Sequence, residues 1–402
     1  MNRFKDKKIT LGVSSGIAIY KAVDLASRLR KTNAQLNIVM TEDAKKMISP
    51  VVFSAVGNCP VYSDYFNEVK DGWIPHTQLS MESDVFVVAP ATSNIIAKIA
   101  NGISDDLVSL IGLAFRKKAK IVVPTMNTRM YDSPAFQRNL KNLKNDGWTI
   151  VEPEVGHLAC GEIGKGRYPD NEIIMEYIEK FLSPQDFKGK KILITAGPTV
   201  EPIDPVRNIT NKSSGKMGYE IAKEFALRGA EVILISGPTN LKPSPLIKEI
   251  INITTAEEML EAAKDKYENM NIIIMTAAVS DFKVKNASKQ KIKKDKDSIT
   301  LELIKNPDIL KTIGKIKKEN QLLVGFAAET NNLIEYAKKK LKEKNCDLII
   351  ANDVSKAETG FNVDYNEVYI LNKLGDVTHV EKNTKKNIAI NIADYISKLI
   401  NS

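Results

Sequence analysis

The chain begins the same structural pattern twice, once at its N-terminus and again near its midpoint. Residues 7–16 read KKITLGVSSG, and residues 190–218 read KKILITAGPTVEPIDPVRNITNKSSGKMG. In both stretches a charged start leads into a short apolar run and then through glycine toward a segment expected to be helical. A strand that passes through a glycine turn into a helix is typical of nucleotide sites in doubly wound sheets. Two such beginnings predict two α/β domains, each with its own phosphate-bearing ligand.

Apolar runs alternate with helix-like segments through both halves. Strands are expected at residues 9–13, 36–40, 85–89, 121–124, 192–195, 232–236, 272–277, 322–327, 348–351, 367–371 and 377–381. Helices are expected at residues 17–30, 94–100, 172–182, 218–228, 256–267, 331–344 and 387–400. Wholly apolar runs such as 85–89 are typical of parallel strands buried on both faces. The alternation predicts an α/β protein with two Rossmann-like domains.

The boundary between the halves is expected at residues 183–186, which read SPQD. Proline cannot continue the preceding helix, and 402 residues exceed the usual size of one domain. We therefore expect one domain over residues 1–186 and a second over residues 187–402.

Composition narrows the class of protein. A net charge of +9 without a basic tail fits small anionic ligands, and it also fits nucleic acid. Cys59, Cys160 and Cys346 have neither metal-ligand nor disulfide spacing, which favours a reducing compartment. The sequence has no targeting pattern and no apolar run long enough to span a bilayer. We expect a cytoplasmic protein that does not act at a membrane.

Three segments of the first half carry candidate catalytic residues. His76 lies in WIPHT, and Asn127 lies in PTMNTRM just past a predicted strand, where open α/β sheets bind ligands. Cys160 lies in a stretch with four glycines among residues 156–166. Such glycine content argues against a rigid element and predicts a mobile lid that carries a thiol to the site.

The runs PTMNTRM and ACGEIGKGR resemble the flavin-dependent cysteine decarboxylases. With its second half included, the chain resembles the bifunctional proteins of coenzyme A biosynthesis, in which phosphopantothenoylcysteine decarboxylase is joined to phosphopantothenate–cysteine ligase. This resemblance implies a flavodoxin-like N-terminal domain in which FMN oxidises the substrate's cysteinyl thiol, CO2 leaves, and the product is then reduced. It implies that His76 assists oxidative decarboxylation, that Asn127 holds the substrate carboxylate and that Cys160 donates the final proton.

The resemblance also implies the residues that contact FMN, which are Ser14, Ser15, Gly16, Thr41, Ala91, Thr92, Ser93 and Asn94. Residues 14–16 precede one expected helix and residues 91–94 lead into another, and backbone amides at the start of a helix bind phosphate. Two positions depart from the family pattern: Tyr131 stands where tryptophan is common, and Tyr168 where methionine is common. We expect both to affect the fit of the substrate and not the chemistry.

The second half carries a different set of candidates. Residues 213–217, SSGKM, are not a P-loop, because the upstream glycine and the magnesium-binding hydroxyl are missing. The small residues Ala277 and Ala278 let a nucleotide lie against the strand ends, and Asp281 is suited to a sugar, a base or a metal ion. Seven lysines follow between Lys283 and Lys296, most of them expected in a solvated loop, with one or two neutralising a triphosphate.

For this half the resemblance implies a ligase that forms an acyl-cytidylate with CTP and Mg2+. It implies that Asn211 holds the acyl-cytidylate with Arg207 nearby, and that Lys291 neutralises the phosphates. The residues implied for CTP are Ala277, Ala278, Asp281, Asn306, Pro307, Asp308, Ile309, Phe326, Lys340 and Lys344, with Asp281 also a possible metal ligand. The four-residue spacing of Lys340 and Lys344 by itself favours an exposed basic face of a helix.

The implied partners are 4'-phosphopantothenate, L-cysteine, CTP and phosphopantothenoylcysteine. The resemblance further implies a homo-oligomer, a dodecamer with a trimer-based decarboxylase core and ligase dimers. Two other hypotheses stay open. One is a regulatory flavoprotein without turnover, and the other is a nucleic-acid-binding protein that uses residues 283–296, the lysine loop. Cys160 and the absence of an acidic tail disfavour the first, and the lack of interleaved aromatic residues disfavours the second.

Overall fold

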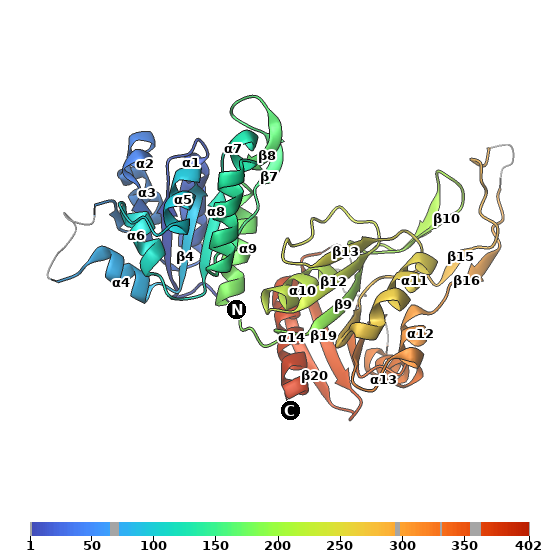
Figure 1. Cartoon of the computed structure of the whole chain (residues 1–402). Helices are drawn as coiled ribbons and strands as arrows, with labels where there is room; N and C mark the ends of the chain where they lie inside the picture. The colour runs from blue at the N-terminus through green and yellow to red at the C-terminus, as the bar shows by residue number, and fades with distance from the viewer. Residues whose placement is uncertain (1, 65–71, 294–297, 330–331, 354–362, 402) are drawn as a thin grey trace. The chain divides into compact units, whose positions relative to one another are not determined.

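The computed structural model describes residues 2–64, 72–293, 298–329, 332–353 and 363–401. Internal contacts divide the chain into two compact units, Asn2–Ser183 and Pro184–Ser402 (Figure 1). Each unit is built around its own sheet, with two hydrophobic clusters. In the described parts of the chain, no helix has the length and apolar character needed to cross a membrane.

The first unit is a parallel sheet with helices on both faces. Its strands run in the order β3-β2-β1-β4-β5-β6, with bounds β1 Lys8–Val13, β2 Gln35–Met40, β3 Val61–Tyr62, β4 Val85–Ala91, β5 Lys120–Pro124 and β6 Thr149–Ile150. The helices are α1 Ile19–Lys31, α2 Glu42–Met47, α3 Pro50–Gly57, α4 Pro75–Glu82, α5 Ser93–Ala100, α6 Leu107–Ala114, α7 Thr128–Tyr131, α8 Pro134–Asn145 and α9 Asn171–Leu182.

The central strand β4 explains why this sheet reads as apolar runs. Val85 and Val87 belong to one hydrophobic cluster, and Phe86 and Val88 belong to the other. Because successive side chains point to opposite faces, a strand covered on both sides has no solvent-facing position. The predicted strand at residues 85–89 is therefore confirmed and extends to Ala91.

The second unit contains an eight-stranded mixed sheet in the order β13-β12-β9-β14-β17-β18-β19-β20. Its first six strands are parallel and its last two antiparallel, with bounds β9 Lys191–Ala196, β12 Glu231–Ser236, β13 Glu249–Asn252, β14 Ile272–Met275, β17 Leu322–Glu329, β18 Leu348–Asp353, β19 Tyr365–Asn372 and β20 Val377–Thr384. The helices are α10 Lys216–Leu227, α11 Ala256–Lys266, the 3-10 turn η1 Tyr267–Asn269, α12 Ile309–Ile316, α13 Leu333–Glu343 and α14 Lys385–Asn401.

Two small antiparallel pairs project from the second unit (Figure 1). They are β10 Val200–Pro202 with β11 Asn208–Thr210, and β15 Phe282–Val284 with β16 Leu303–Lys305. The sequence patterns miss both, because three-residue strands carry too little periodicity to recognise.

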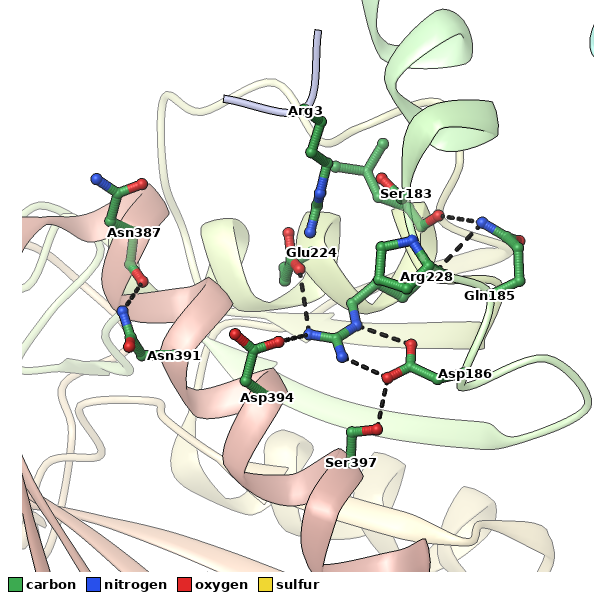
Figure 2. Close-up of polar contacts among 12 residues, drawn as sticks. Arg3, Ser183, Gln185, Asp186, Glu224, Arg228, Asn387, Asn391, Asp394 and Ser397 are labelled. Carbon is green, nitrogen blue, oxygen red and sulfur yellow. Dashed lines mark hydrogen bonds and ion pairs between the residues drawn. The ribbon is translucent and has the colours of Figure 1, made fainter. Parts of the chain in front are cut away.

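A buried ion cluster holds the start of the second unit to its last helix (Figure 2). The Arg228 guanidinium is 3% exposed and donates to Asp186 Oδ1 at 2.9 Å and to Asp394 Oδ1, on α14, at 2.6 Å. Glu224 lies 3.6 Å away, and Ser397 Oγ donates to Asp186 Oδ2. Burial alone would raise the pKa of Asp186, yet the Arg228 hydrogen bonds hold that pKa below its ordinary value. One arginine thus neutralises carboxylates from three separate segments.

Candidate active sites in the two units

A cavity of about 850 Å3 lies at the carboxyl edge of the first sheet. Loops that follow β1, β4 and β5 line it, together with residues 157–160 and 166–168. Parallel strands that end at one edge bring distant segments together there. Among the residues predicted for this half, those in the lining are Ser15, Gly16, Thr92, Ser93, Asn127 and Cys160.

The other predicted flavin contacts lie behind this lining or beside it. Ser14 is buried and joins two loops, because its Oγ donates to Pro90 O at 2.8 Å and accepts from Thr92 N at 3.0 Å. Thr41 caps α2 by accepting from Ala44 N at 3.2 Å. Ala91 is fully buried and Asn94 is exposed. The structure thus gathers half of the predicted set of eight into the cavity.

Asn127 is positioned by the helix that follows it. Its Oδ1 accepts from Met130 N at 2.8 Å and caps α7. Its Nδ2 has no hydrogen-bond partner among the residues that the structure describes. An amide donor is therefore left for an acceptor in the cavity, and a carboxylate is such an acceptor.

The glycine-rich segment forms a hairpin, so the prediction that it has no regular structure is wrong, while its motion as a lid stays a prediction. Strands β7 Glu154–His157 and β8 Ile163–Arg167 pair antiparallel. Gly166 has φ +140°, and a Cβ there would lie 2.0 Å from Met126 O. Met126 N also donates to Gly166 O at 3.1 Å. The glycines thus allow close docking of the hairpin on the turn that carries Asn127.

Cys160 lies in the turn of this hairpin and is exposed. Its Sγ donates to Glu162 Oε2 at 3.9 Å, and Glu162 is ion-paired with Arg129 of α7 at 2.8 Å. Cys59 and Cys346 have raised pKa values, about 11 and about 12, because both thiols are largely buried. Among the three thiols, Cys160 is the accessible one.

The two tyrosines that depart from the family pattern occupy different places. Tyr168 lines the cavity, is 1% exposed and donates to Asn171 Oδ1 at 3.1 Å. Tyr131 does not line it; the ring is buried, and its hydroxyl donates to Glu152 Oε2 at 2.7 Å. Burial, with the Glu152 carboxylate, raises the pKa of Tyr131 to about 12. Of the two, only Tyr168 is placed to touch a ligand in this cavity.

His76 is not brought to the cavity within its own chain. It lies in the first turn of α4 and does not line the cavity. Its Nδ1 is buried without a hydrogen-bond partner in the part of the chain that the structure describes. Sequence reasoning missed Lys21, His157 and Arg167, which do line the cavity. Lys21 lies within an ordinary amphipathic helix, so its position gave no signal.

The second unit has two adjoining cavities at its carboxyl edge. The first, about 480 Å3, is lined by most of the residues predicted for CTP: Ala277, Asp281, Asn306, Pro307, Asp308, Ile309, Phe326, Lys340 and Lys344. The second, about 510 Å3, includes Asn211 and Ala278. Ala277, Val279, Phe326 and Lys340 line both. Two ligands bound here would therefore lie next to each other.

Lys340 of α13 and Lys344, the residue that ends this helix, line the first cavity, so the exposed helix face that their spacing favours is wrong. Ala337 and Leu341 are buried on the core side of α13, and Lys340 and Lys344 line the cavity. Lys340 Nζ donates to Phe326 O at 2.8 Å. Lys344 pairs with Asp308. Asp308 Oδ1 also accepts from Lys311 N at 2.9 Å and so caps α12. Although burial acts to raise the Asp308 pKa, Lys344 and the helix amide hold it below its ordinary value.

Asn306 and Asp281 shape the opposite wall of this cavity. Asn306 Nδ2 donates to Ser280 O at 2.9 Å, and its Oδ1 is buried without a partner in the described structure. Asp281 lines the cavity and is exposed. Among the described residues, no three carboxylate, imidazole or thiol groups gather around one point. A lone carboxylate suits Mg2+ only when phosphates supply other ligands, which is how Mg2+ commonly binds nucleotides.

The second cavity is formed where α10 begins. Gly218 approaches β14 so closely that a Cβ would lie 2.4 Å from Thr276 Oγ1. Asn211 Nδ2 donates to the carbonyls of Ala278 and Val279, each at 3.1 Å. Lys385 also lines this cavity, and burial lowers its pKa. Lys385 opens the last helix, far along the chain, so sequence spacing could not bring it to this site.

Two predicted ligase residues lie in neither cavity. Arg207 Nη2 donates to Ile292 O at 2.6 Å, and Asp204 Oδ2 accepts from Ile292 N at 3.2 Å. These hydrogen bonds hold Ile292. Lys291, the residue before it, is exposed and lines neither cavity. Lys283 and Lys285 pair with Glu257 and Glu302, but Lys283 lies in β15, so the expected loop begins as a strand. Lys294 and Lys296 lie outside the described residues.

Comparisons with known proteins match both units. A family model described as flavoprotein matches residues 2–183, and the model for the DNA/pantothenate metabolism flavoprotein C-terminal domain matches residues 187–400. A coenzyme A biosynthesis bifunctional protein CoaBC of Bacillus subtilis is 44% identical over 397 residues, 98% of this chain and 97% of that protein. The protein of the same name from Escherichia coli K12 is 44% identical over 374 residues, 92% of each chain.

A solved structure of the C-terminal domain of a CoaBC protein covers 54% of this chain and 98% of its own, with 44% identity and a TM-score of 0.47. The second family model alone spans more than half of the chain, and the relatives match it over nearly its full length. The chain therefore belongs to the family of coenzyme A biosynthesis bifunctional proteins.

Proposed function

We propose that the chain carries two enzymes of coenzyme A biosynthesis. Residues 1–186 would be a flavin-dependent phosphopantothenoylcysteine decarboxylase, and residues 187–402 a CTP-dependent phosphopantothenate–cysteine ligase. One observation carries this proposal: each unit gathers a different set of family residues, from distant segments, at the carboxyl edge of its own sheet. The second unit would make the phosphopantothenoylcysteine that the first consumes.

The cavity of the first unit suits FMN and a substrate together. Residues at the starts of helices, Ser15, Gly16 and Ser93, suit a phosphate, and Met126 and Met130 suit a flat apolar ring. Bound flavin supplies the oxidation of the substrate thiol and later a hydride. Asn127 Nδ2 would then hold the substrate carboxylate, and Cys160 Sγ would donate the proton that accompanies the hydride.

Assembly into a homo-oligomer would complete this first site. Ile17, Tyr20, Met47 and Met130 line the cavity and are exposed, at 41–68%. Apolar side chains gathered in this way mark contact surfaces. We propose that His76 of a neighbouring copy reaches this cavity, within the trimer-based decarboxylase core and dodecamer that the family resemblance implies.

The ligase site would divide its two cavities between nucleotide and acid. CTP with Mg2+ would occupy the cavity with Lys340, Lys344 and Asp281, and 4'-phosphopantothenate would occupy the cavity with Asn211. Positively charged side chains beside the phosphates stabilise the negative charge that develops there. They thereby favour transfer of the cytidylyl group to 4'-phosphopantothenate and the departure of pyrophosphate. L-Cysteine then displaces CMP from the acyl-cytidylate. Lys291 would join the site from the lysine loop, together with Arg207, which holds that loop through Ile292 O. Ligase dimerisation would accompany this.

The first experiment is an absorption spectrum of the purified protein with added FMN, where a bound flavin is expected. The second is continuous release of pyrophosphate over many turnovers, which should need CTP, 4'-phosphopantothenate and cysteine together, because cysteine clears the acyl-cytidylate. ATP and UTP in place of CTP test the base. A protein that rejects FMN would rule out the decarboxylase, and one that binds FMN without releasing CO2 would favour the regulatory flavoprotein. DNA binding at physiological salt would favour the nucleic-acid reading of the lysine loop.

The proposed role of Lys291 has its own test. Lys291→Gln should slow pyrophosphate release, because one positive charge near the leaving group is removed. The matched control is Lys285→Gln, since Lys285 belongs to the same loop but pairs with Glu302 at 2.7 Å. Equal rates for Lys291→Gln and the unaltered protein would remove Lys291 from the mechanism. The expected cytoplasmic location stays a prediction of the sequence.

A further inference from the structure

Glu152 joins three elements around the hairpin that carries Cys160. It lies after β6, and its carboxylate accepts from Tyr131 of α7 at 2.7 Å. It also pairs with Lys165 of β8 at 2.8 Å and with Lys144 of α8 at 3.4 Å. These four residues are called the Glu152 network below. Glu152 itself does not line the cavity.

The network connects the two catalytic segments of the first unit. Tyr131 ends the short helix that Asn127 caps, and Lys165 lies five residues after Cys160 in the sequence. Lys165 Nζ also lies 5.0 Å from the centroid of the Tyr131 ring. The helix side and the hairpin side are therefore tied to one carboxylate as well as to each other.

The hydroxyl of Tyr131 is held in its direction by the packing of the ring. Tyr131 is 5% exposed, and its ring packs on Phe136 at 5.4 Å between centroids. A buried hydroxyl that loses its acceptor is costly, so the ring and α7 would have to shift. An uncharged acceptor at position 152 would therefore keep α7 and Asn127 in place, whereas loss of the Glu152 charge frees Lys165 and the hairpin.

We propose that Glu152 is a positioning residue that sets the distance between Asn127 and Cys160 and thereby couples decarboxylation to the final reduction. This inference rests on the proposed function. That reduction adds a hydride, from the reduced flavin, and a proton, from Cys160 Sγ, across the carbon–carbon double bond left when CO2 departs. Loss of CO2 does not use the Cys160 proton, so a displaced hairpin impairs the second step and spares the first.

The test follows one turnover of the bound flavin without oxygen and measures the rate of 4'-phosphopantetheine formation relative to the rate of CO2 release from supplied phosphopantothenoylcysteine, a ratio of rates. Glu152→Gln keeps an acceptor for Tyr131 but removes the charge that pairs with Lys165. It should lower this ratio about tenfold, because displacing a catalytic group by a fraction of an ångström costs such factors. Tyr131→Phe keeps the packing of the ring and should lower the ratio less. The control is Lys144→Met. Lys144 contacts the same carboxylate from α8, and its replacement should leave the ratio unchanged.

Amide hydrogen exchange gives a second readout that does not need flavin or substrate. In Glu152→Gln, exchange at residues 154–167 should become faster, with little change in α1 and β1. An unchanged ratio and unchanged exchange in Glu152→Gln would overturn the inference, as would a Lys144→Met variant with the same loss. If the unaltered protein releases no CO2, the proposed function has failed, and hydrogen exchange still decides whether Glu152 anchors the hairpin.

Discussion

The two units have their cavities at the same edge of their sheets, but the residues that line that edge differ. The first uses a single cavity with methionine and other apolar walls, and one of its predicted catalytic residues, His76, lies outside it. The second uses two adjoining cavities lined by lysine, asparagine and aspartate, with nearly the whole predicted nucleotide set in place. Sheet topology thus fixes where a ligand binds, and the loops after the strands fix which chemistry it meets.

The largest expected effect tests whether the second unit is stable by itself. Arg228→Gln removes the charge that neutralises Asp186, Glu224 and Asp394, and breaking a buried ion cluster costs about 3–5 kcal/mol. Urea unfolding should show this loss in the second unit, while flavin binding in the first is kept. Lys248→Gln is the control, because its pair with Glu231 is exposed and worth less than about 1 kcal/mol. Equal losses in the two variants would contradict the account.

The next effect concerns the first unit alone. Gly166→Ala adds a Cβ that would lie 2.0 Å from Met126 O at φ +140°. The hairpin must move, so formation of 4'-phosphopantetheine should fall at least about 100-fold, with ligation unchanged. Gly161→Ala has a similar backbone constraint, φ +85°, but no atom within 4 Å, and should cost less than about tenfold. A ligase rate that falls in parallel would mean that the two units are not separate enzymes.

A smaller effect tests the nucleotide cavity. Lys340→Gln removes a charge that lines both cavities, and the KM for CTP should rise about tenfold, since a charge-assisted hydrogen bond is worth about 1.5–3 kcal/mol. Lys338→Gln, exposed on the same helix, is the control. Decarboxylation of supplied phosphopantothenoylcysteine should be unaffected by either. A KM that rises equally in both variants would point to the general charge of α13.

The smallest effect is a pH dependence of stability. The pKa of Asp308 is lowered in the folded protein, so its pairing stabilises above the unfolded carboxyl's pKa, about 3.9, and is lost as the pH falls through the folded value. Asp308→Asn keeps a helix-capping side chain but no charge. Because Asp308 is 43% exposed, solvent screening limits the loss to below about 1 kcal/mol near neutral pH. The urea midpoints of the unaltered protein and Asp308→Asn should converge as the pH falls. A difference between them that widens in acid would contradict the expected direction.

Sequence reasoning worked best where burial leaves a period or a run. The apolar strand β4 was predictable because both its faces are covered, and α10 was predictable from the glycine turn that precedes it. The hairpin β7–β8 was not, because its glycines serve close docking on Met126 and Thr128, a contact between distant segments. The side of α13 that carries Lys340 and Lys344 likewise depends on where Ala337 and Leu341 pack.

Site residues divide along the same line. Asn127 follows a strand and Cys160 lies in a distinctive motif, so both could be named from the sequence, and they line one cavity. Lys21 and Lys385 could not, because one lies in an ordinary helix and the other opens a helix far along the chain. Lys291 is named by resemblance alone, and His76 is a weak candidate until the resemblance gives it a role. Neither lines one of the three cavities described above.

One measurement tests the central claim most directly, that two enzymes work in succession on this chain. The purified protein with FMN, Mg2+, CTP, 4'-phosphopantothenate and cysteine is sampled for pyrophosphate, CO2 and 4'-phosphopantetheine in the same reaction. We expect all three in equal amounts. Cys160→Ser should keep pyrophosphate release and release one CO2 per bound flavin, because its flavin then stays reduced, while 4'-phosphopantetheine is lost. Absence of pyrophosphate or of CO2 from the unaltered protein, or a Cys160→Ser variant that still forms 4'-phosphopantetheine at the normal rate, would contradict it.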